Sequence, residues 1–142
     1  MASLDFSGLD ELNAAFARMA EIPERVTANA LSAMAEVAAK KIKSRGEAAG
    51  IRDPESSVHI LDKIKASKPK ITDSGGYADI TFQGARTRGR TKTRNAEIAF
   101  VNEYGKRGQQ ARPFIGTAMT QSEQAIVDAG AEVLGDYIEK NF

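Results

Sequence analysis

The sequence predicts an α+β domain: a short helix and a long alanine-rich helix, then a small antiparallel sheet, then a C-terminal helix packed on the sheet. Apolar residues recur every three or four positions before residue 45 and again after Pro113, as on the buried face of a helix. Between residues 77 and 82 they alternate with polar residues, as in a half-buried strand. Because the helices precede and follow the sheet, the order favours α+β over βαβ.

Two helices are predicted before the sheet. The first is indicated by Leu9, Leu12, Phe16 and Met19 at helical spacing, with Ser7 as its capping residue. The second is predicted to begin at Pro23, because proline is favoured in a first helical turn. Its apolar face consists of Val26, Ala30, Leu31, Met34, Val37, Ala38 and Ile42. The small alanines on this face predict close packing along the helix.

The rest of the chain is divided by glycine and proline. Residues 46–54 are predicted to form a loop, and the spacing of Ile60, Leu61 and Ile64 permits a short helical turn after it. A β-hairpin is predicted around a turn at residues 73–76, followed by a further strand at residues 97–101. The final helix is predicted over residues 113–137, with Pro113 in its first turn.

The composition predicts one folded, soluble domain that spans residues 1–142. Hydrophobic residues make up 42% of the chain and charged residues 27%, which is close to average globular usage. No apolar run is long enough to span a bilayer, and the N-terminus lacks the pattern of a secretion signal, so no membrane contact is expected.

The chemistry of an active site is not evident in the sequence. The chain has no cysteine and one histidine, His59, which excludes thiolate metal sites and sites built on paired imidazoles. Its acidic residues are scattered along helices, and no glycine-rich loop leads into Lys-Ser or Lys-Thr. We therefore predict no catalytic, metal or cofactor-binding residue, no cofactor and no enzymatic activity.

Basic residues are concentrated in one segment. Five of them, the basic ribbon, occupy every second position: Arg86, Arg88, Arg90, Lys92 and Arg94. Removing these five from the 20 Lys and Arg leaves 15 against 19 acidic residues, so the formal net charge of +1 conceals a local asymmetry. In an extended chain all five would project from one face. Residues 83–96 are predicted to form a mobile hairpin loop, whose ribbon is either solvated, in contact with an acidic protein partner, or in contact with nucleic-acid phosphates.

A second distinctive stretch joins residues 100–105 to residues 111–114. An apolar run ends in an acid, an aromatic residue and a chain-reversing glycine, and a short polar loop then leads to Arg-Pro-Phe. This pattern predicts a docking corner. Its candidate interface residues are Glu103, Tyr104, Gly105, Arg112, Pro113 and Phe114. The alternative interpretation of Arg-Pro-Phe is a plain helix start with a core phenylalanine.

Three segments in order resemble a family of structural proteins of long-tailed bacteriophages, the neck or tail-completion proteins found at head–tail joining and as minor tail components. The segments are residues 8–12 (GLDEL), residues 101–105 (VNEYG) and residues 111–118 (ARPFIGTA). Members of that family are similar in opening with an amphipathic helix and a long alanine-rich helix, and in closing with an ARPF-like segment that runs into the last helix.

The resemblance implies a virion protein of a phage or prophage that acts by assembly. It would form a homo-oligomeric ring, for which a hexamer is one candidate, at the head–tail junction or tail end. Its partners would be head-connector and tail-tube or tail-terminator proteins, with non-specific DNA contact as a further option. It would reside in the host cytoplasm before assembly. At the corner, we expect Phe114 to bury against the sheet and Arg112 to form a charge-assisted pair with Glu103. The competing function is a nucleic-acid-binding module that uses the basic ribbon.

Overall fold

The fold is described by a computed structural model, which covers residues 22–51, 59–73 and 75–142. Its longest elements are two helices, α2 (Glu24–Ala48) and α4 (Ile115–Asn141). Between them in sequence lie the 3-10 helix η1 (Ile60–Lys63), six short strands and helix α3 (Asn95–Tyr104). The helix predicted from Leu9, Leu12, Phe16 and Met19 lies outside the described residues. The α+β class is confirmed.

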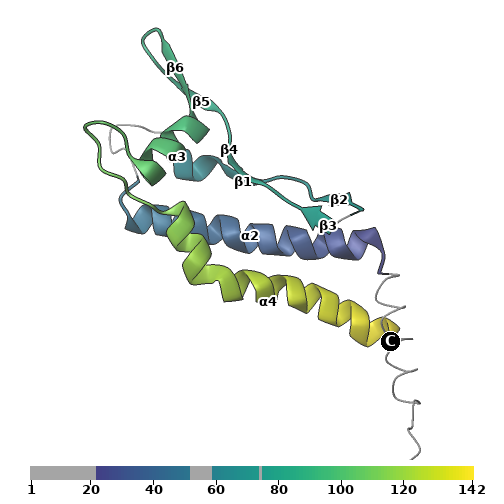
Figure 1. The fold of residues 1–142 in the computed structure, drawn as a ribbon. Helices are drawn as coiled ribbons and strands as arrows, with labels where there is room; N and C mark the ends of the chain where they lie inside the picture. The colour runs from purple at the N-terminus through teal and green to yellow at the C-terminus, as the bar shows by residue number, and fades with distance from the viewer. Residues whose placement is uncertain (1–21, 52–58, 74) are drawn as a thin grey trace, which may run out of the picture.

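Helices α2 and α4 pack along each other in antiparallel directions, as expected from the alanines of α2 (Figure 1). Gly46, near the end of α2, lies against Phe114 at the start of α4, whereas Gly130 lies against Met34. A Cβ atom on Gly130 would come within 2.6 Å of the Met34 sulfur, so a larger residue there would require the Met34 side chain to move. Small residues therefore determine how near the two helices come.

The strands lie on the other side of α2 from α4 (Figure 1). Strand β1 (Ile64–Ala66) pairs with β4 (Ile80–Phe82), and β2 (Lys70–Thr72) pairs with β3 (Gly75–Tyr77), all antiparallel. The register changes by one residue between the two pairs, because residues 67–69 lie opposite only residues 78 and 79. This confirms the predicted hairpin and its alternation, since Ile80 and Phe82 are half-buried and Thr81 is exposed.

A core cluster lies at the C-terminal end of α2. Its buried members are Ile42, Ile51, Ile60, Leu61, Ala99, Phe114 and Ala118. Gly46 lies beside this cluster, and a Cβ there would come within 2.5 Å of Leu61 Cδ2. The C-terminal helix therefore packs chiefly on α2, and it meets the strands at its N-terminal end through Phe114 and Phe82.

Several helix boundaries differ from the predictions: α2 begins at Glu24, after Pro23, and α4 extends to Asn141. The loop predicted from Gly46 begins later, because α2 continues to Ala48 and the residue with positive φ that terminates it is Gly50, at +75°. The amides of Gly50 and Ile51 bond back to the carbonyls of Glu47 and Gly46, which closes the last turn. Helix α4 begins at Ile115, so Pro113 precedes the helix instead of forming its first turn.

The strand predicted at residues 97–101 is wrong, because this segment belongs to helix α3. Its buried residues are Asn95, Ala99 and Asn102, at helical spacing, whereas a strand would have placed Ala99 opposite Ile98 and Phe100. The buried polar residues hid this period, because an apolar pattern alone does not include asparagine. Asn95 can be buried because two of its donors are satisfied: its side-chain N–H donates to Gln83 O at 2.7 Å, and its backbone N–H donates to Gly84 O.

Candidate docking surface

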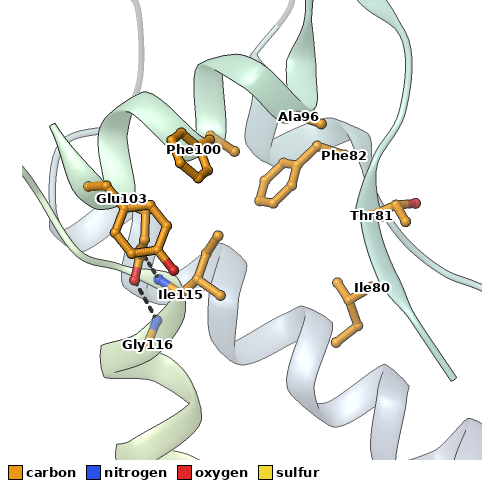
Figure 2. A pocket seen from close by; sticks show the side chains of 10 residues that line it. Ile80, Thr81, Phe82, Ala96, Phe100, Glu103, Ile115 and Gly116 are labelled. Atoms are coloured by element: carbon orange, nitrogen blue, oxygen red, sulfur yellow. Dashed lines mark hydrogen bonds between the residues drawn. The ribbon is translucent and has the colours of Figure 1, made fainter. Parts of the chain in front are cut away.

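Glu103 joins α3 to the first turn of α4. One carboxylate oxygen accepts the backbone N–H groups of Phe114 and Ile115, each at 2.8 Å, and the other accepts that of Gly116 at 2.9 Å. Figure 2 shows the bonds from Ile115 and Gly116. The residue before α4 is Phe114, which has no side-chain oxygen to cap the helix. Glu103 therefore supplies both the missing acceptor and a negative charge at the positive end of the helix dipole.

The structure does not form the expected pair between Arg112 and Glu103. The Arg112 guanidinium donates to Gly50 O at 3.0 Å and to Asn102 Oδ1 at 2.7 Å, and its backbone amide donates to Asn102 O. The Glu103 carboxylate accepts the three backbone N–H groups of residues 114–116. Arg112 instead ties the end of α2 to α3.

Two further corner residues have structural roles: Phe114 fills the core, and Gly105 turns the backbone. Phe114 is 0% exposed and meets Phe82 edge to face, with ring centroids 6.0 Å apart, so its burial against the sheet is confirmed. Gly105 ends α3 with φ of +78°, which confirms the predicted chain reversal at this glycine. Phe114 is therefore a core residue, and its contribution to docking can only be indirect.

The aromatic surface of the corner is formed by Phe100 and Tyr104. Their side chains are 62% and 70% exposed, and their ring centroids lie 4.8 Å apart. Tyr104 was a candidate from sequence, but Phe100 was not, because the segment was predicted as a strand. On a helix their spacing of four residues places them on one face, which is the signal that a helical assignment would have provided.

A shallow hollow of about 390 Å³ lies beside this pair, between α3, β4 and the start of α4. Figure 2 shows Phe82, Phe100, Ile80 and Ile115 facing it. A second hollow, of about 430 Å³, lies on the other side of Phe100 and extends to Arg94. We refer to the two together as the α3 groove. Apolar side chains form most of it, and Glu103, already bonded to α4, forms part of the edge.

The basic ribbon folds into a separate hairpin, β5 (Ala85–Arg88) and β6 (Thr91–Arg94). Arg86 pairs with Thr93, and Thr87 pairs with Lys92. Paired residues of an antiparallel hairpin share a face, so the prediction of five cations on one face is wrong. The turn reverses the chain and places the positions of Arg86 and Arg88 on one face and those of Lys92 and Arg94 on the other.

Replacing the α4 cap provides a stability test. We expect Glu103→Gln to lower the free energy of unfolding by about 2 kcal/mol, because an amide accepts on one side only and turns an N–H toward Gly116. Urea denaturation, monitored by circular dichroism, measures the change in the free energy of unfolding. Glu97→Gln is the control: its ion pair with Arg94 is largely exposed, and its loss should cost less than about 0.5 kcal/mol. Equal losses in the two variants would contradict the cap.

No described group of three or more His, Cys, Asp or Glu side chains is arranged to hold a metal ion. Within the described ranges, no helix has both the length and the apolar content to cross a bilayer. Comparisons with protein-family models, with curated proteins and with solved structures find no match to this chain.

Proposed function

We propose that this protein is a non-enzymatic structural component that acts by docking onto neighbouring subunits, and that its docking surface is the α3 groove. The observation that carries the proposal is the exposure of Phe100 and Tyr104 beside an apolar hollow. Exposed aromatic side chains next to a hollow are typical of the energetic centre of protein interfaces.

The attachment of α3 to the rest of the fold supports this proposal. Asn102 and Glu103 bond to Arg112 and to the first turn of α4, and Ala99 is buried in the core. The aromatic pair therefore stands on a helix that is fixed at several points. Such preorganisation lowers the entropic cost of binding.

The phage assignment rests on the resemblance of the three segments. Two of them, residues 101–105 and 111–118, contact each other through the Glu103 and Arg112 hydrogen bonds, so they form one structural unit. We propose a place in the virion, at the head–tail junction or tail end, as a ring subunit that contacts connector and tail-tube or tail-terminator proteins. Before assembly the chain would reside in the host cytoplasm.

Complementation of a phage that lacks the gene tests this function. We expect Phe100→Asp with Tyr104→Asp to leave the chain folded but absent from purified particles, with infectious titre lowered roughly a hundredfold. Mass spectrometry of particles and plaque counts are the measurements. Tyr77→Asp with Val127→Asp is the matched control, because both residues are exposed and lie outside the groove. Equal titres with the groove variant and the wild-type chain would contradict the proposal.

A second candidate function uses the basic ribbon. The β5–β6 hairpin projects away from α2 and α4 (Figure 1). Arg90 lies at its turn, and Lys92 is exposed. Cations on both faces of such a ribbon suit phosphates on two sides of a groove. Duplex DNA binding that weakens steeply with salt, and that is lost in Arg90→Ala with Lys92→Ala, would favour this alternative. Full complementation by that same variant would favour the structural role.

A further inference from the structure

We propose that the α3 groove receives the N-terminal segment, residues 1–21, of a second copy of this chain. The inference rests on the proposed docking function and names the partner: the copies would associate head to tail. It draws on three observations, namely the chemistry of the groove, the composition of the segment and the length of α2.

The groove and the segment are complementary in polarity. The groove presents apolar surface from Phe82, Phe100 and Ile115, and its two acids, Glu97 and Glu103, are already bonded to Arg94 and to the start of α4. It extends to the base of the basic hairpin at Arg94. Residues 85–94 contain five basic residues and no acidic one. Such a surface fits a segment with one apolar face and an acidic remainder.

Residues 1–21 have this composition. Leu9, Leu12, Phe16 and Met19 recur at helical spacing, which predicts an apolar stripe. The charged residues of the segment are four acids and one base: Asp5, Asp10, Glu11, Glu21 and Arg18. Burial of the apolar stripe in the groove would therefore leave the acids near the hairpin.

The length of α2 indicates that Phe16, and the residues between it and α2, would have to come from another copy. The segment is attached before Glu24, whereas the groove adjoins Ile115, the neighbour of Phe114, which contacts Gly46 near the far end of α2. From Glu24 to Gly46 the helix rises roughly 33 Å. Phe16 precedes Pro23 by seven residues, which span at most about 25 Å when fully extended. Phe16 therefore cannot reach the aromatic end of its own groove.

We call residues 1–21 the arm. Because the arm and the groove are different surfaces of the chain, an arm of one copy in the groove of the next is a heterologous contact. Each copy would give its arm to one neighbour and receive the arm of another, which yields a closed ring if the rotation closes and an open chain if it does not. Assembly would thus need no second kind of subunit.

Single-cysteine variants test the contact, since the natural chain has no cysteine. Full-length Phe16→Cys and Tyr104→Cys chains are mixed and oxidised, and disulfide-linked heterodimers are scored on non-reducing gels. We expect the mixture to cross-link at least tenfold more than Phe16→Cys mixed with Val127→Cys, because Val127 is also exposed on the surface but lies outside the groove.

Charge variants give a second, independent readout. We expect Phe16→Asp and Phe100→Asp each to raise the dissociation constant for self-association at least about tenfold, as measured by sedimentation velocity. Mixed at equal concentration, the two variants should form one-to-one dimers and nothing larger, since each mixture retains one intact arm and one intact groove per pair.

Three results would overturn the inference. One is equal cross-linking to Tyr104→Cys and Val127→Cys; another is an intramolecular disulfide in a dilute Phe16→Cys, Tyr104→Cys double variant. The third is a chain that stays monomeric at high concentration. If the groove variant also fails in phage complementation, the docking function stands and only the choice of partner is wrong. If complementation is normal, the docking function is wrong as well.

Discussion

Phe114→Ala is expected to lower the free energy of unfolding by about 4 kcal/mol, since removal of a buried phenylalanine leaves a cavity that the surrounding core fills only in part. Phe114 is 0% exposed, lies edge to face with Phe82, and packs beside Leu61 against Gly46. It links both long helices to the strands, so no single element can move in to fill the void. Thermal unfolding should shift by about 10 °C, and urea denaturation measures the free energy itself.

Phe114→Leu is the control for this change. It keeps an apolar side chain in the core and loses only the edge-to-face contact and part of the volume, so its cost should be about 1–2 kcal/mol. An alanine variant no less stable than the leucine variant would mean that the ring does not close the junction between α2, α4 and β4.

Gly105→Ala is expected to cost about 3 kcal/mol. Gly105 has φ of +78° and ψ of 176°, a conformation that residues with a Cβ rarely adopt. A Cβ there would also come within 2.8 Å of Ala111 N and 3.0 Å of Gln109 O. These are backbone atoms and cannot turn aside, so the loop that leads to Arg112 would have to shift.

Gly108→Ala separates the two contributions. Gly108 also has positive φ, at +83°, but no atom lies within 4 Å of the position of its Cβ. We expect a loss of about 1 kcal/mol for the conformational term alone. The difference between the variants, measured by urea denaturation, isolates the close approach of Gly105 to Ala111. Equal losses would show that this approach costs nothing.

Much of the fold could be predicted because it depends on local patterns. The apolar period of α2, the alternation of Ile80 and Phe82, and the turn at Gly105 are properties of neighbouring residues, and each is confirmed. The prediction of a strand at residues 97–101 was wrong because it also relied on a local apolar pattern. Its buried face contains Asn95 and Asn102, whose burial depends on partners outside the segment.

The candidate site was predicted in part. Its stretch of sequence was singled out, and Tyr104 does reach the surface. Phe100 was missed, and the roles of Glu103 and Arg112 were assigned to the wrong partners. The basic ribbon was recognised, but the turn between its two halves places them on opposite faces.

The sequence by itself determined the fold class, the long alanine-rich helix, the hairpin and the position of the corner, because helical and strand periods and glycine turns act over a few residues. The tertiary structure alone decided which atoms the corner residues bind. Arg112 meets Gly50 across 62 positions of the chain, and Glu103 caps a helix that begins at Ile115. A hydrogen-bonding side chain takes whichever unsatisfied donor or acceptor the folded chain brings within reach, and no local pattern specifies that choice.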